Sequence, residues 1–166
     1  MDKQLMALEA ILRDEVAIYG ALVSRLPFKI ALIKKNRVPQ LERITQQEEA
    51  DYKRLAELEK HRAEVVQEIL ALMPKGVGPQ LTSIAQHVAL SWRDRLLAPS
   101  KQLVELAREL KEGHETCRVL LRASLEFVDF SLQLVAKAAN AQPTVYGDAE
   151  PMTQVPTRSV LLDWRA

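Results

Sequence analysis

Apolar residues recur every three or four positions along most of this 166-residue chain, which is the spacing of amphipathic α-helices. The first such run covers residues 5–33 and contains Pro27. A proline inside a helix removes a backbone donor and clashes with the preceding turn, so we expect Pro27 to kink or break this helix.

The second run, residues 36–73, has the most regular spacing in the chain. Asn36 followed by Pro39 is typical of a helix start, with the asparagine as N-cap and the proline in the first turn. At about 1.5 Å per residue this helix would be about 55 Å long, which favours a coiled coil or an elongated bundle. Glu48, Asp51 and Arg62 occupy positions on its apolar seam, where we expect them to set the register or to pair with charges on a neighbouring helix.

The sequence MPKGVGP at 73–79 stops any helix and predicts a turn that reverses the chain. A weaker helical stretch at 81–97 should end or bend at Pro99, and Ser100 is a plausible cap for a last helix starting at Lys101, with Gly113 as a soft point. The pattern therefore predicts an all-α protein, an elongated antiparallel bundle of three long helices plus a shorter one. We expect the bundle to cover residues 1–140 and a proline-containing extended tail to cover 141–166.

The last helix is apolar around an unusually wide arc. At about 100° per residue, two separate apolar faces emerge, with a narrow polar wedge between them. We call them the inner face (Cys117, Leu121, Leu125, Val128, Leu132 and Val135) and the outer face (Val119, Leu120, Phe127, Phe130 and Leu134). A helix that leans on one neighbour needs only a stripe of about 100°. We therefore expect the inner face to pack in the molecule's own core, and Leu120, Phe127, Phe130 and Leu134 to bind another protein.

Composition narrows the function classes. A low content of glycine (5 residues) and of aromatic residues (5%) disfavours a β sandwich or barrel. The formal net charge of +1 gives no global field to attract nucleic acid or an anionic membrane. The first ten residues do not resemble a secretory signal, and no run of about 18 consecutive apolar residues is present, so we expect a cytosolic protein without membrane insertion.

Candidate chemistry is sparse. The three histidines, His61, His87 and His114, lie in no metal-binding spacing, and a single cysteine cannot form a thiolate zinc site, so we expect neither a metal nor a cofactor. An enzyme using Cys117 as nucleophile with His114 about one turn away is an alternative, although the apolar pattern explains Cys117 without chemistry.

One segment is rich in basic residues, with no acid between Glu15 and Glu42. Its members are Arg25, Lys29, Lys34, Lys35 and Arg37. Such a segment could contact phosphates, but it holds a single aromatic residue and is more typical of a solvated helix end, so we expect no nucleic-acid partner.

Three blocks resemble the FlgN family of flagellar type III export chaperones. They are ITQQEEADYKRLAELEKHR at 44–62, VLLRASLEFVDFSLQLV at 119–135, and QPTVYGDAE at 142–150, which is similar to the family's Pro-Thr-x-Tyr-Gly tail motif. The blocks follow the order found in the family and cover nearly the whole chain.

The resemblance implies a cytosolic, non-enzymatic chaperone that holds the hook-filament junction (hook-associated) proteins before export and delivers them to the membrane export gate. It implies that Tyr146, with Gly147, contacts the cytosolic domain of that gate. From the residues alone, Tyr146 is either a local turn contact, which Gly147 favours, or an exposed binding anchor. A structural or adaptor bundle that self-associates through the same apolar face remains the alternative, and the sequence leaves open whether the chain is a monomer or a weak dimer.

Overall fold

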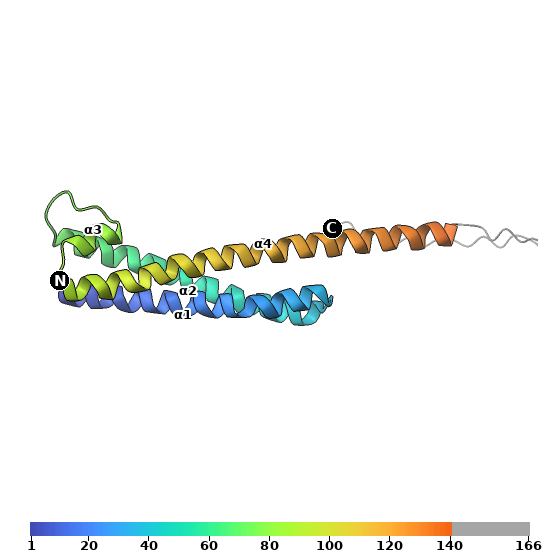
Figure 1. The fold of residues 1–166 in the computed structure, drawn as a ribbon, viewed down its shortest axis with the longest axis horizontal. Coiled ribbons are helices and arrows are strands. Elements are labelled where there is room, and N and C mark those ends of the chain that lie inside the picture. The colour runs from blue at the N-terminus through green and yellow to red at the C-terminus, as the bar shows by residue number, and fades with distance from the viewer. Residues whose placement is uncertain (141–166) are drawn as a thin grey trace, which may run out of the picture.

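The computed structural model describes residues 1–140. The helices are α1 (Asp2–Lys34), α2 (Val38–Ala71), the short α3 (Leu81–Gln86) and α4 (Leu90–Asn140), and no strand occurs within the described range (Figure 1). The predicted all-α fold with three long helices and a shorter one is confirmed. The predicted tail, 141–166, lies outside the described residues.

Helix α1 is the centre of the molecule. Both α2 and α4 pack along it, whereas α2 and α4 hardly approach each other. α2 returns antiparallel to α1, and α4 then runs in the same direction as α1 (Figure 1). Because α1 has neighbours on two sides, it needs apolar residues on two sides, and it is accordingly the most apolar of the three long helices.

Two clusters of buried side chains form the core, and α1 contributes to both. One cluster lies at the end of the bundle that carries α3, and the other lies towards the α1–α2 turn. The first contains Leu5, Leu8, Ile11, Leu12, Val65, Ile69, Ile84 and Leu96, and the second Ile18, Leu22, Leu26, Ile33, Leu110 and Cys117. By length and composition alone, α1 is apolar enough to cross a membrane, and it is the one helix within residues 1–140 that meets this criterion. Its place between α2 and α4 accounts for this apolar character by packing.

The α1–α2 turn corrects the expected role of Asn36. Asn36 has a positive φ of 51°, and its N–H donates to the carbonyl of Ile33 while the N–H of Arg37 donates to the carbonyl of Leu32. This pair of bonds is the Schellman pattern that closes a helix, and asparagine tolerates the left-handed conformation it needs. Asn36 therefore terminates α1, and Arg37 precedes the first residue of α2, with Pro39 in its first turn.

The expected break at Pro27 is wrong, because α1 continues through it. Pro27 is exposed, so water can reach the carbonyl of Val23 that the proline leaves without a donor. Core residues on both sides of the proline, Leu26 before it and Ile33 after it, stabilise the continuous helix.

The expected helix boundary at Pro99 is also wrong. Pro99 lies inside α4, so Ser100 and Lys101 are interior residues of that helix and not its start. The break comes earlier, after α3 ends at Gln86, and α4 then begins at Leu90. Packing of Leu96 and Leu103 against the first core cluster, on either side of the proline, stabilises the continuous helix.

The prediction that the polar seam residues of α2 pair across helices is confirmed. Three ion pairs join α2 to α1: Arg25 with Asp51, Lys29 with Glu48, and Glu15 with Arg62, the last with an N–O distance of 3.1 Å. A further pair, between Glu9 and Arg95, joins α1 to α4. Because Glu9, Glu15 and Glu48 are buried, the three pairs that they form fix the axial position of one helix against the next.

Candidate protein-binding surface on α4

The C-terminal part of α4 extends past the α1–α2 turn as a single helix (Figure 1). Leu26 of α1 lies against Gly113 of α4, which sets the register of the two parallel helices. α1 ends at Lys34, eight residues beyond Leu26, so α4 loses its neighbour near Leu121. The remaining residues to 140 project about 28 Å at 1.5 Å per residue. We call residues 118–140 the overhang.

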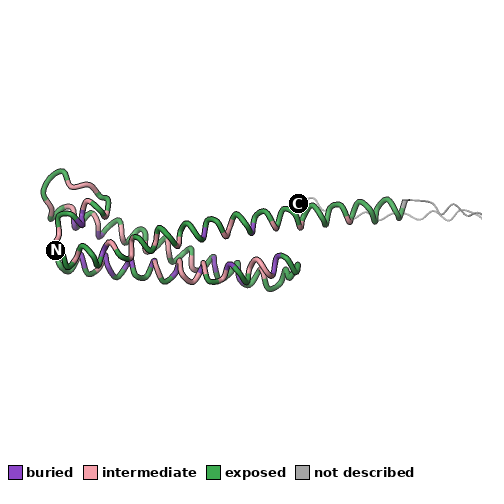
Figure 2. Tube along the Cα trace, viewed as in Figure 1, coloured by how far each residue is buried: buried purple, intermediate pink, exposed green. Residues whose placement is uncertain are grey.

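No residue of the overhang from 118 to 139 is buried, as Figure 2 shows along the projecting helix. The last buried residue of α4 is Cys117. Exposed apolar side chains follow it on both faces of the helix. They are Val119, Leu121, Leu125, Phe127, Val128, Phe130, Leu132, Leu134 and Val135.

The expectation that the inner face packs in the molecule's own core is therefore wrong beyond Cys117. Leu125 is 66% exposed and Leu132 is 62% exposed. The physical reason is length: the bundle of α1 and α2 ends near the base of the overhang. It leaves Leu132 uncovered and borders Leu125 only across an open hollow. Beyond Leu125, both apolar faces of the overhang are exposed within the described part of the chain.

The predicted outer-face residues lie on one side of the overhang, but they do not share one environment. Phe127, Phe130 and Leu134 are 71%, 58% and 51% exposed, respectively. Leu120 is half-buried, because it packs against the second core cluster where α4 leaves the bundle. The outer face therefore starts at the rim of the core and continues as a free apolar surface. Helices that are apolar over most of their circumference are normally covered on several sides.

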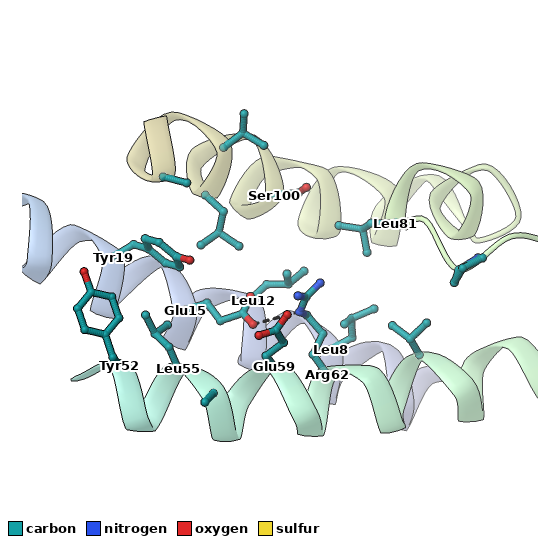
Figure 3. A pocket seen from close by; sticks show the side chains of 16 residues that line it. Leu8, Leu12, Glu15, Tyr19, Tyr52, Leu55, Glu59, Arg62, Leu81 and Ser100 are labelled. Atoms are coloured by element: carbon teal, nitrogen blue, oxygen red, sulfur yellow. Dashed lines mark hydrogen bonds and ion pairs between the residues drawn. The ribbon is translucent and has the colours of Figure 1, made fainter. Parts of the chain in front are cut away.

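An open groove runs between α2 and α4, with α1 as its floor. Figure 3 shows its part next to α3, a hollow of about 510 Å³ in which the ion pair of Glu15 with Arg62 crosses a mainly apolar lining. Tyr19 and Tyr52 line its far end. A second hollow of about 510 Å³ adjoins the base of the overhang and includes Tyr52, Leu121 and Leu125.

The sequence analysis did not identify this groove. It exists because the backbones of α2 and α4 both pack along α1 and hardly approach each other, although the side chains of Tyr52 and His114 meet across it. Helical periodicity does not reveal this relationship. The sequence feature that could have indicated the groove is Tyr52, an aromatic residue that follows Asp51 and precedes Lys53 and Arg54.

Cys117 does not have the setting of a nucleophile. It is 4% exposed, and burial raises the pKa of its thiol, an effect that nearby Lys29 only partly offsets. Burial lowers the pKa of His114, and the charge of Lys29 lowers it further. His114 faces Tyr52, with 3.4 Å between Nε2 and the phenol oxygen. A buried thiol of raised pKa is a small core residue and not an activated thiolate.

The basic segment is partly neutralised. Arg25 and Lys29 pair with acids of α2, which leaves Lys34, Lys35 and Arg37 exposed at the α1–α2 turn. In residues 1–140, no group of three or more His, Cys, Asp or Glu side chains is placed to hold a metal ion.

Comparison with known proteins gives one match. A family model described as FlgN protein matches residues 1–153, which is more than nine-tenths of the chain. No curated protein and no solved structure matches significantly. The match covers α1 to α4, including the overhang, and it agrees with the three sequence blocks that resemble this family. The chain therefore belongs to the FlgN family of flagellar export chaperones.

Proposed function

We propose that this chain is a cytosolic chaperone of the hook-filament junction (hook-associated) proteins, which it binds through the outer face of the overhang. It keeps these clients competent for export and delivers them to the flagellar type III export gate. The observation that carries the proposal is the exposure of Phe127, Phe130 and Leu134 on a helix that projects beyond its own bundle.

The chemistry of this surface suits an amphipathic helix of the client. Such a helix is recognised by apolar side chains at helical spacing, and Phe127, Phe130 and Leu134 follow one another at steps of three and four. Large aromatic side chains bury much area on binding, and a few such residues usually supply most of the affinity. Half-buried Leu120 would anchor the client where the overhang meets the bundle.

The test is calorimetric titration of the full-length chain with a hook-associated protein encoded in the same genome. We expect Phe127→Ser and Phe130→Ser each to weaken binding at least about tenfold, because each removes a buried aromatic contact from the complex. The helical content should not change, since both side chains are exposed in the free protein.

The matched control is Leu125→Ser, which removes an equally exposed apolar side chain from the inner face. We expect it to keep the affinity of the unsubstituted chain. Unchanged affinity for both phenylalanine variants, or the same loss for Leu125→Ser, would contradict the assignment of the client to the outer face.

For the export gate we propose contact through Tyr146 and Gly147, which lie outside the described residues. The support is the Tyr-Gly tail motif of the resemblance and the tendency of tyrosine to act as a binding hot spot. Tyr146→Ala should keep client affinity and lose affinity for the cytosolic domain of the gate. Equal gate affinity, or parallel loss of both affinities, would contradict this role.

A further inference from the structure

The second hollow, at the base of the overhang, is an open apolar site that the proposed client site does not use. Tyr52 of α2 and Leu121 and Leu125 of α4 line it with exposed side chains, and the buried Cys117 also contributes to its lining. Its volume of about 510 Å³ is that of a pocket for a few side chains and not of a channel for a whole helix. The hollow therefore suits a short apolar segment.

The free charges around this hollow are basic. Arg118 and Arg122 line it with exposed side chains, whereas the buried Glu48 is already paired with Lys29. Within residues 1–140, Arg122 forms no ion pair, and Arg118 pairs only with the exposed Glu115. A guanidinium group binds carboxylates and also stacks on aromatic rings. An occupant with apolar side chains, an acid and an aromatic ring would match both the interior and the rim.

The chain itself contains such a segment, outside the described residues. Positions 160–164 read VLLDW, which is four large apolar residues and one aspartate. Between 141 and 159 the large apolar residues are scattered among prolines and polar residues. Trp164 and Asp163 supply the aromatic ring and the carboxylate that the arginines of the rim can bind.

The length of the intervening chain decides which hollow the segment can reach. Leu121 and Asn140 are about 28 Å apart along α4 at 1.5 Å per residue. The chain from 141 to 160 has a root-mean-square end-to-end length of about 25 Å as a flexible coil. The hollow next to α3 lies about 55 Å from Asn140 at Leu103, close to the full extension of about 66 Å. Effective concentration is highest where the linker length matches the span, which favours the second hollow.

We infer that residues 160–164 fold back onto their own chain and occupy the second hollow, with Leu161 and Trp164 against its apolar lining and Asp163 beside Arg122. The linker holds the segment at an effective concentration of about 1 mM, so a segment with a dissociation constant of about 0.1 mM is docked in about nine-tenths of the molecules. The outer face stays free when the segment is docked. The inference therefore does not depend on the client or on the proposed function.

The test is the fluorescence of Trp164 in the full-length W92F variant, in which Trp164 is the one remaining tryptophan. Docking should shift its emission to shorter wavelength and make acrylamide quench it at least about threefold less than in denaturant. Leu125→Asp should abolish this protection, because it places a charge in the apolar lining at a side chain that is exposed in residues 1–140. The matched control is Leu132→Asp, at an equally exposed leucine of the inner face outside the hollow, which should keep the protection.

A second readout keeps Trp92 and uses Cys117, which lines the hollow. The double variant L161D/L162D should make this thiol react with an aromatic disulfide reagent at least about threefold faster in the folded full-length chain, because the hollow is then uncovered. The control M152D/V155D places the same charges in the intervening chain and should leave the rate unchanged. Circular dichroism should show the same helical content for every variant.

Three results would each overturn the inference. They are quenching of Trp164 as strong as in denaturant, equal effects of Leu125→Asp and Leu132→Asp, and a Cys117 rate that L161D/L162D leaves unchanged. Protection of Trp164 that appears only at high protein concentration would also overturn it, because the segment would then occupy a second copy and not its own chain.

Discussion

Leu26 of α1 packs directly against the backbone of α4 at Gly113: a Cβ atom added to that glycine would lie 2.3 Å from Leu26 Cδ1 and 3.0 Å from its Cγ. The glycine is therefore a close-packing point that sets where α4 leaves the bundle, and not the soft point expected from sequence. The three atoms nearest to the added methyl belong to Leu26, a buried leucine that has little room to move.

This contact predicts opposite effects of one substitution at two glycines. Gly20→Ala, where no atom lies within 4 Å of the added Cβ, should raise the free energy of unfolding by about 0.5–1 kcal/mol through helix propensity. The Gly113→Ala variant gains the same helix propensity, but its alanine overpacks against Leu26. Its free energy of unfolding should therefore be about 1–3 kcal/mol lower than that of Gly20→Ala. Urea unfolding of both variants checks this, and equal stabilisation by both would show that Leu26 moves aside freely.

The ion pair of Lys29 with Glu48 predicts that its removal lowers stability and leaves client affinity unchanged. Both side chains are largely buried, so Glu48→Gln leaves the ammonium without its counter-charge and should lower the free energy of unfolding by about 1–3 kcal/mol. The neighbouring Glu49→Gln, at an exposed residue paired only with Lys53, should leave stability unchanged. Client affinity should be the same for both. A selective loss of client binding in Glu48→Gln would show that this pair is not purely structural.

His114 predicts how stability depends on pH. Because its folded-state pKa lies below the ordinary value of 6.5, the unfolded chain binds the proton first as the pH falls. The contribution of His114 to the free energy of unfolding should therefore be largest above about pH 6.5 and decrease below it. His114→Gln should flatten this decrease between about pH 7 and pH 5.5. An identical slope in the His114 variant would contradict the assignment.

The burial of Cys117 predicts that its thiol reacts slowly in the folded protein. Burial and a raised pKa should make the folded protein react with an aromatic disulfide reagent at least about tenfold more slowly than the protein in denaturant. The measurement is the rate of thiolate release at neutral pH. Reaction of the folded chain as fast as the unfolded one would restore the nucleophile hypothesis.

Much of the fold could be predicted from the sequence because helical periodicity is local. The spacing of Ile44, Leu55 and Val65 is sufficient to identify α2 and its inward face. The polar seam residues, too, could be expected to pair, since a charge on an apolar seam needs a counter-charge.

The errors arose where tertiary packing decides the outcome. Pro27 and Pro99 do not break their helices, because core contacts on both sides of each proline outweigh one lost hydrogen bond. The two apolar faces of α4 could be recognised from sequence. The absence of any helix beside Leu125 and Leu132 could not, since it depends on the register of α4 against α1.

The measurement that tests the central claim most directly is site-specific photo-crosslinking on the full-length chain. Benzoylphenylalanine is placed at Phe127 on the outer face, at Leu125 on the inner face, or at Lys53 on the exposed side of α2. Each protein is irradiated with a hook-associated protein and the adducts are identified by mass. The account predicts a client adduct from position 127 and no client adduct from position 125 or position 53. A client adduct from position 125 or 53 but none from position 127 would contradict it.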